Sequence, residues 1–181
     1  MGEKKELRLS GTGGQGLILA GIIIADAAIR DGKNSVQSQS YGPEARGGAS
    51  RAEVIIGDGE IDYPKVSRPD VLLVMSQEAC DKFAFDLERG GVLIADSTYV
   101  QKLPAIDGLV YKLPISSVAK EQVGHEMVAN VVALGAMARI TGVVSREALT
   151  EALLSRIPSG TEELNRRALN LGWELAEKIM Q

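Results

Sequence analysis

Three glycines, at positions 11, 13 and 16, constrain the fold of this chain more than any other feature of its sequence. They follow the alternating segment Leu7–Ser10, which predicts a strand, and they precede Leu17–Arg30, which predicts a largely buried helix. In this G-x-G-x-x-G pattern the first glycine permits a tight turn, the second lets backbone approach a pyrophosphate, and the third lets the helix pack closely on the sheet. The helix N-terminus would offer free N–H groups to an anion.

Two departures limit what this turn can bind. Dinucleotide-binding folds carry an acidic residue about 20 positions further on, for the ribose, and the corresponding residue here is Gln37. A P-loop needs Gly-Lys-Ser/Thr, whereas Leu17 follows Gly16. Two interpretations therefore stay open: a turn that only shapes the chain, and a turn that touches a phosphate-bearing ligand. The candidate contacts in the second case are Gly11, Gly13, Gly14, Gln15 and Gly16.

The remaining hydrophobic pattern predicts one three-layer α/β/α domain over residues 1–181, with a mainly parallel, Rossmann-like sheet and a helical C-terminal third. Further strands are expected at 34–39, 52–56, 71–75, 92–95 and 109–113. Further helices are expected at 76–89, 118–141, 146–156 and 162–180. Ser76, Ser145 and Thr161 stand where helix N-caps belong.

Composition narrows the functional class. The formal charge of −4 argues against a nucleic-acid or acidic-membrane binder, because such proteins need a basic surplus. The longest apolar run, Leu17–Ala25, is too short to span a bilayer, and the charged N-terminal segment does not resemble a signal peptide. A single cysteine, Cys80, cannot form an intrachain disulfide or ligate an iron–sulfur cluster. We therefore expect a protein of the reducing cytoplasm.

A second glycine-rich segment, Tyr41–Arg51, contains Gly47-Gly48 between two arginines and predicts a loop. Arginine forks bind carboxylates and phosphates, and paired glycines permit close approach of another backbone. In a parallel sheet this loop would emerge at the same edge as the first turn. A simpler alternative is a solvated loop in which Glu44 and Arg46 pair with each other. The candidate contacts of the segment are Tyr41, Glu44, Arg46, Gly47, Gly48 and Arg51.

Other motifs do not form a catalytic or metal site, and we expect neither in this chain. His125-Glu126 begins a zinc motif, but its second histidine is replaced by Ala129. Gly57-Asp58-Gly59 resembles the start of a thiamine-diphosphate motif, but no Asn lies between Asn34 and Asn130 to complete it. Cys80 is expected to be a packed thiol. The acidic residues of the 76–89 helix, which are Glu78, Asp81 and Asp86, are expected on a solvated face.

Segments spread nearly end to end together resemble the gamma subunit of 2-oxoacid:ferredoxin oxidoreductases. The matching segments are 10–16 with the helix that follows, 37–48, 63–65 with 69–70, 75–79, and Asn130 with 133–135. The Tyr-Gly-Pro-Glu-Ala-Arg-Gly-Gly sequence at 41–48 looks most like the branch that uses 2-oxoglutarate.

This resemblance implies a role within a larger enzyme. The holoenzyme decarboxylates a 2-oxoacid on thiamine diphosphate, transfers the acyl group to coenzyme A, and passes electrons through iron–sulfur centres to ferredoxin. Thiamine diphosphate, magnesium and the clusters belong to the alpha and beta subunits or to a ferredoxin-like delta subunit. The gamma subunit carries no redox cofactor and is not active alone.

Our working hypothesis is that both glycine-rich segments lie at the interface with alpha or beta and help to close the coenzyme A site. A branched side chain at Gly13 is then expected to clash in the tight turn. Three alternatives remain: a relative that uses pyruvate, a branched-chain 2-oxoacid or an arylpyruvate; a free-standing dinucleotide-binding protein; and a scaffold subunit without ligand contact.

Overall fold

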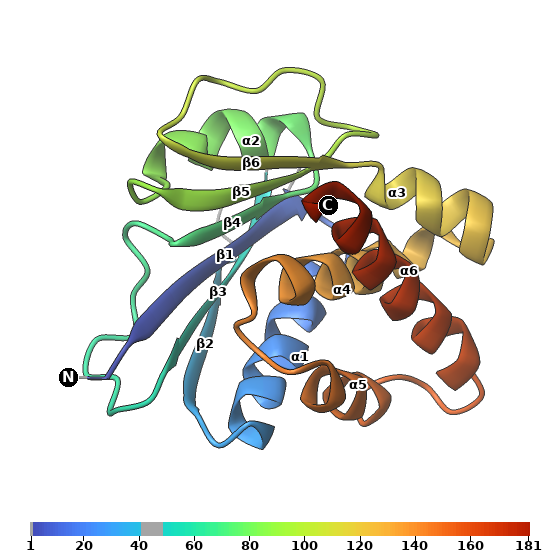
Figure 1. Ribbon diagram of the computed structural model, residues 1–181, viewed down its shortest axis with the longest axis horizontal. Helices are drawn as coiled ribbons and strands as arrows, with labels where there is room; N and C mark the ends of the chain where they lie inside the picture. The colour runs from blue at the N-terminus through green and yellow to red at the C-terminus, as the bar shows by residue number, and fades with distance from the viewer. Residues whose placement is uncertain (1, 41–48) are drawn as a thin grey trace.

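The computed structural model describes residues 2–40 and 49–181, and this part of the chain forms one sheet with helices on both faces (Figure 1). The strands are β1 (Lys4–Thr12), β2 (Asn34–Ser40), β3 (Ala49–Gly57), β4 (Val71–Val74), β5 (Gly91–Asp96) and β6 (Gly108–Leu113). Their spatial order is β2-β3-β1-β4-β5-β6. The strands β1, β4, β5 and β6 lie side by side in that order and run parallel to one another. Strand β3 is antiparallel to both of its neighbours, β1 and β2. The predicted mainly parallel sheet is confirmed, with β3 as the exception.

The direction of β3 follows from the length of its connection. Only residues 41–48 separate Ser40 from Ala49, whereas a parallel crossover needs roughly a dozen residues or more. An antiparallel pair is therefore the arrangement that this connection allows. Its consequence is that β2 ends and β3 begins at one edge of the sheet. That edge also holds the end of β1, because Thr12 pairs with Ala49.

Helices of unequal number cover the two faces. The α-helices are α1 (Leu17–Arg30), α2 (Gln77–Phe83), α3 (Ile115–Val118), α4 (Ala129–Thr141), α5 (Arg146–Leu154) and α6 (Glu162–Met180). Figure 1 shows α2 above the sheet and α1, α4, α5 and α6 below it. Successive strand residues point to opposite faces of the sheet. Leu73 and Ile94 belong to the core between the sheet and the layer of α1 and α4, whereas Leu72 and Leu93 belong to the core between the sheet and α2. The predicted three layers are confirmed. Within residues 2–40 and 49–181, every helix is too short or too polar to span a bilayer.

The helix expected at 76–89 is shorter than predicted. Ser76 caps α2 as expected, accepting a hydrogen bond from the Ala79 N–H at 3.1 Å, but α2 ends at Phe83 and a 3-10 turn, η2 (Ala84–Asp86), follows. This turn brings Asp86 to the buried Arg8, with 2.7 Å between Oδ2 and Nη1. The Asp86 side chain stays 47% exposed, in keeping with the predicted solvated face, but it also forms a long-range ion pair that the sequence did not predict.

The helix expected at 118–141 is interrupted. A π-helical turn, η3 (Ala119–Val123), ends at Gly124, whose φ of +93° belongs to the left-handed region that favours glycine. The chain then passes through η4 (Glu126–Val128) into α4. Ser145 caps α5 by accepting from the Ala148 N–H at 3.1 Å. Thr161 is the N-cap residue of α6, as predicted, but its side chain makes no capping hydrogen bond, because its hydroxyl donates to the Pro158 carbonyl instead.

Two glycines set the distance between α4 and α6. A Cβ added at Gly135 would collide with the Leu169 carbonyl, and one added at Gly172 would collide with the Val132 carbonyl. Each helix therefore presents a bare backbone position to the other. Close approach of this kind depends on glycine for its lack of a side chain and not for its backbone freedom.

Replacing Gly172 by Ala is expected to lower the free energy of unfolding by about 2 kcal/mol, because overpacking must push the helices apart. Glu174→Ala, at an exposed position on the same helix, serves as the control and should change stability little. Denaturant unfolding of both variants measures the difference. Equal midpoints for the two would contradict the packing described.

Candidate functional site

The glycine turn between β1 and α1 needs its glycines for different reasons. Gly14 and Gly16 have φ of +90° and +73°, in the left-handed region, and Gly16 is the N-cap of α1. Gly11 instead lies in β1, where a Cβ would collide with Oε1 of Gln15 and lie 2.8 Å from Cδ1 of Leu17. Gly13 is different again, because a Cβ there would meet no atom of residues 2–40 and 49–181 within 4 Å. Among residues 2–40 and 49–181, nothing stands in the way of a Cβ at Gly13, so the described residues give no support to the expected clash of a branched side chain there.

The Gln15 side chain links the ends of two neighbouring strands. Its Oε1 accepts a hydrogen bond from the Thr12 N–H at 2.8 Å, and its Nε2 donates to the Met75 carbonyl at 2.9 Å. Thr12 ends β1, and Met75 directly follows β4. Gln15 was expected as a ligand contact, and in this structure both ends of its amide bind the chain itself.

The start of α1 is fixed from the opposite side by Asn130. This buried residue of α4 donates from Nδ2 to the Gly16 carbonyl at 3.1 Å, and its Oδ1 accepts from the Val131 N–H at 2.9 Å. Sequence patterning did not assign Asn130 a role, although the resemblance included it. Its signal is a polar side chain within the otherwise apolar run of residues 128–138.

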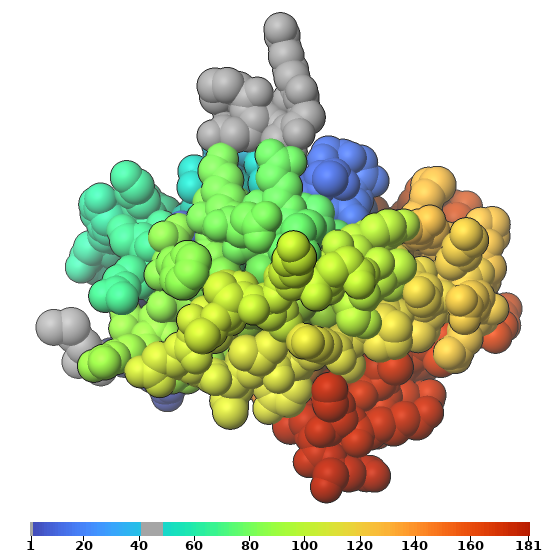
Figure 2. Space-filling view, turned by 90° about the horizontal axis from the view of Figure 1, so that it is seen from above, coloured from blue at the N-terminus to red at the C-terminus, as the bar shows by residue number. Residues whose placement is uncertain are grey.

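A cavity of about 660 Å³ opens beside the turn. It lies where β1 leads to α1 on one face and β4 leads to α2 on the other, which is the position at which open α/β sheets bind ligands. In Figure 2 the blue glycine turn lies between the green α2 segment and the gold segment that leads to α4. The residues that line the cavity are Thr12, Gly13, Gly14, Gln15, Met75, Ser76, Gln77, Glu78, Tyr99, Ser116, Glu126, Met127 and Ala129.

The described wall of this cavity is acidic. Glu78 and Glu126 contribute carboxylates, and among residues 2–40 and 49–181 no Lys, Arg or His lines it. The Tyr99 hydroxyl donates to Glu126, and this hydrogen bond, followed by burial, raises the pKa of the Tyr99 phenol above its ordinary value. Tyr99 therefore stays protonated at neutral pH. An anionic ligand in this cavity would need positive charge from another source.

Asp96 organises the neighbouring part of the same edge. This fully buried carboxylate, at the end of β5, accepts hydrogen bonds from the backbone N–H groups of Thr98 and Ser116 at 3.1 and 3.2 Å and from the Ser116 hydroxyl. It thereby holds the start of α3, whose Ser116 reaches the cavity. Sequence reasoning missed Asp96, although an acidic residue directly after a buried strand is the signal that could have found it.

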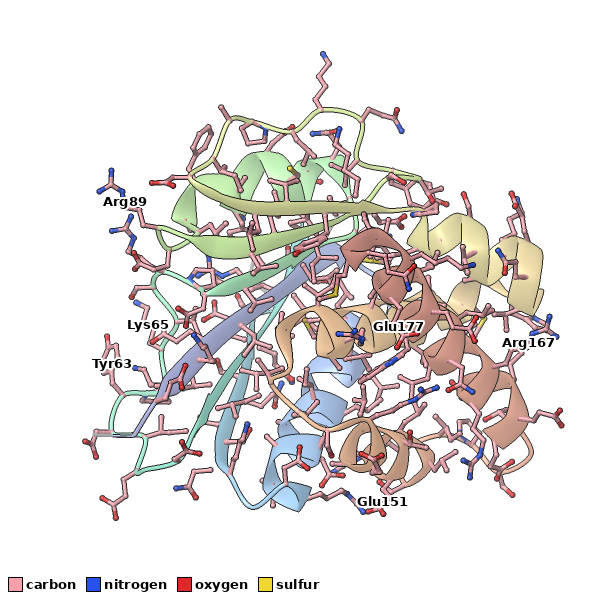
Figure 3. The ribbon with its side chains drawn as sticks, in the orientation of Figure 1. Tyr63, Lys65, Arg89, Glu151, Arg167 and Glu177 are labelled. Atoms are coloured by element: carbon pink, nitrogen blue, oxygen red, sulfur yellow. The ribbon has the colours of Figure 1, made fainter. Side chains whose placement is uncertain are left out.

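Arg51 lies in β3 and not in a loop as expected. Its Nε is 3.1 Å from Oε1 of Glu53, and its guanidinium carbon is 5.6 Å from the centre of the Phe83 ring. Glu53 also pairs with the buried Arg8, at 3.4 Å. Arg51 and Glu53 border a smaller cavity of about 140 Å³ with Lys65. Figure 3 shows Lys65 at the outer margin of the sheet, so this second cavity is a separate part of the surface.

The other candidates of the second glycine-rich segment lie outside the described residues: Tyr41, Glu44, Arg46, Gly47 and Gly48. The two described ends of that segment, Ser40 and Ala49, are placed at the edge that holds the glycine turn, since Ala49 pairs with Thr12. The sequence predicted that both segments leave the sheet at this edge, and their attachment points do.

Cys80 is a packed thiol, as expected. It is fully buried in α2, and burial, followed by the charge of Asp81, raises the pKa of the thiol. A raised pKa keeps the sulfur protonated at neutral pH, which makes it a poor nucleophile. In the described residues no group of three or more His, Cys, Asp or Glu side chains is placed to hold a metal ion.

Comparison with known proteins gives a consistent family. A family model described as pyruvate ferredoxin/flavodoxin oxidoreductase matches residues 6–175. The 2-oxoglutarate synthase subunit KorC of Methanocaldococcus jannaschii is 49% identical over 179 residues, which cover 97% of this chain and 96% of the relative. The pyruvate synthase subunit PorC of Methanothermobacter thermautotrophicus is 32% identical over 178 residues, which cover 96% of this chain and 97% of the relative.

A solved structure matches the fold closely. The crystal structure of a keto/oxoacid ferredoxin oxidoreductase gamma subunit from Geobacter sulfurreducens PCA superposes with a TM-score of 0.88 and 56% sequence identity. The match covers 96% of this chain and 99% of that one. The resemblance inferred from the sequence is thereby confirmed.

The glycine turn generates a paired test of stability. Gly11→Ala is expected to lower the free energy of unfolding by about 2 kcal/mol, because the new methyl group displaces Gln15. Gly13→Ala should change it by less than about 0.5 kcal/mol, since no described residue lies within 4 Å of its methyl group. Thermal unfolding of the two variants measures the contrast. A Gly13 variant as unstable as the Gly11 variant would show that the turn packs differently.

Proposed function

This chain belongs to the pyruvate ferredoxin/flavodoxin oxidoreductase family, and from that premise we propose that it is the gamma-type subunit of a 2-oxoglutarate:ferredoxin oxidoreductase. The holoenzyme converts 2-oxoglutarate and coenzyme A to succinyl-CoA and carbon dioxide, with reduction of ferredoxin. Support for this substrate comes from identity, which is 49% to a 2-oxoglutarate synthase subunit and 32% to a pyruvate synthase subunit of similar length. The proposed partners are the alpha and beta subunits and a ferredoxin-like delta subunit.

The described residues do not fit the redox cofactors of such an enzyme. The one cysteine is buried in the apolar layer under α2 and offers no thiolate to a cluster. The Gly57-Asp58-Gly59 turn follows β3 beside Lys4, at the edge of the sheet opposite to the cavity. We therefore assign thiamine diphosphate, magnesium and the iron–sulfur clusters to the partner subunits and derive no chemical step in this chain.

The observation that carries the proposal is an incomplete binding site. The cavity between the ends of β1 and β4 offers glycine backbone and two carboxylates, and its described wall has no basic side chain. Coenzyme A carries phosphates, which two carboxylates would repel. A cavity of this composition can bind phosphates only when other groups supply positive charge. A neighbouring subunit of a larger enzyme is one source of such groups.

We assign this completion to the second glycine-rich segment and to the neighbouring subunits. Arg46 supplies positive charge toward the phosphates of coenzyme A, while the bare backbone at Gly13 and Gly14 lets the ligand approach closely. The remaining candidates are assigned to contacts with coenzyme A or with the adjoining subunit: Gly11, Gln15, Gly16, Tyr41, Glu44, Gly47, Gly48 and Arg51. Arg51 suits the subunit contact better, because it borders the second cavity.

The substrate assignment predicts the preference of the assembled enzyme. Purified together with its partner subunits, it should show a kcat/KM for 2-oxoglutarate at least roughly tenfold above that for pyruvate. Coenzyme A-dependent reduction of ferredoxin is the assay, with pyruvate, a branched-chain 2-oxoacid and an arylpyruvate as comparison substrates. Preference for one of these would place the chain in a sister branch. Turnover by the isolated chain would contradict a subunit role.

The coenzyme A assignment predicts that Arg46→Ala raises the KM for coenzyme A by roughly tenfold, as expected for loss of a charge-assisted contact. Arg46→Lys should recover part of the loss. The control is Arg167→Ala, since Figure 3 shows Arg167 on α6 at the far margin of the molecule. An unchanged KM with intact assembly would remove the ligand role. Loss of assembly by a folded chain would make Arg46 an interface residue instead.

A further inference from the structure

The main-chain ladder between β1 and β4 stops where the cavity begins. Their register ends at Ser10 and Val74, and one more backbone hydrogen bond joins the Met75 N–H to the Ser10 carbonyl at 2.9 Å. Past this point β1 turns toward α1 on one face while β4 leads to α2 on the other. The Thr12 N–H and the Met75 carbonyl therefore lose strand partners at the floor of the site.

Gln15 supplies both missing partners with one group. A primary amide has a carbonyl that accepts and an NH₂ that donates, so it can take the place of a peptide unit between two strands. Here the amide accepts from Thr12 and donates to Met75. It therefore adds a rung to the ladder beyond its last main-chain bond. Position 11 accommodates only glycine, because the Gln15 amide occupies the space that a Cβ would need.

Within the part of the chain that the structure describes, no side chain supports the backbone of Gly13 and Gly14 in the way that Gln15 supports Thr12. Both residues line the cavity, both are exposed, and a Cβ at either would meet no atom of the described residues within 4 Å. Their placement depends on the residues that flank them. On one side that is Thr12, held by Gln15, and on the other it is Gly16, whose carbonyl is held by Asn130.

We propose that Gln15 is a positioning residue for coenzyme A binding. Its side-chain amide joins β1 to β4 and thereby fixes the position of the Gly13–Gly14 backbone that contacts the ligand. The inference rests on the proposed function, since it assigns the ligand to this cavity wall. Gln15 acts through the turn, because both hydrogen-bonding ends of its amide are used within the chain.

The test uses Gln15→Glu in the assembled enzyme. An ionised carboxylate still accepts from the Thr12 N–H but repels the Met75 carbonyl, whereas the protonated acid can donate to it. The carbonyl and partial burial favour the protonated form. We expect the KM for coenzyme A to rise at least about fivefold at about pH 8.5 and to return toward wild type at about pH 6, with kcat changed less than about twofold.

Gln122→Glu is the matched control, because it makes the same change at an exposed position of η3. Its KM should follow the wild type at both pH values. Gln15→Met is a second variant that removes both hydrogen bonds at similar volume, and its KM should be raised at both pH values. It keeps the inference testable if the Glu variant does not assemble.

The outcomes separate the inference from the function on which it rests. A lowered melting temperature of the Gln15 variants with unchanged KM, while Arg46→Ala and Gly13→Ala raise the KM, would overturn the positioning role alone. Unchanged KM values in all of these variants would overturn the coenzyme A contact and the positioning role together. A pH-dependent KM in Gln15→Glu alone among the Glu variants supports both.

Discussion

The site depends on one constraint, which is that two parallel neighbours, β1 and β4, must send their chains to opposite faces of the sheet. No backbone pairing can continue through such a divergence, so a crevice opens and two main-chain groups lose their partners. The Gln15 amide satisfies both groups, and the bare Cα of Gly11 makes room for it.

Charge is distributed unevenly around this crevice. The cavity presents Glu78 and Glu126, whereas the buried guanidinium of Arg8 lies on the sheet face under α2, paired with Glu53 and Asp86. Arg51 joins that second group through Glu53. Arg8 and Arg51 are thus committed to ion pairs within the chain. This arrangement is one reason to regard the cavity as part of a site that other groups complete.

Much of the fold could be predicted from local pattern. The glycine spacing with a strand before it and a helix after it predicted β1 and α1, and continuous apolar runs predicted the buried β4 and β5. Ser76 and Ser145 were recognised as caps because an N-cap bonds only residues three positions away. The ends of helices were predicted less well: Asp86 is drawn out of α2 by Arg8, distant in sequence, and Gly124 interrupts the run before α4.

By itself the sequence determined the layer order, the edge from which both glycine-rich segments leave, and the family, because hydrophobic periodicity and glycine requirements act over a few neighbouring residues. Only the tertiary structure decided what Gln15, Asn130 and Asp96 do, and that Arg51 faces Glu53 and Phe83. Each of these residues has at least one partner that is distant in sequence, namely Met75, Gly16, Ser116 and Phe83, respectively, and such contacts arise from how strands and helices meet in space.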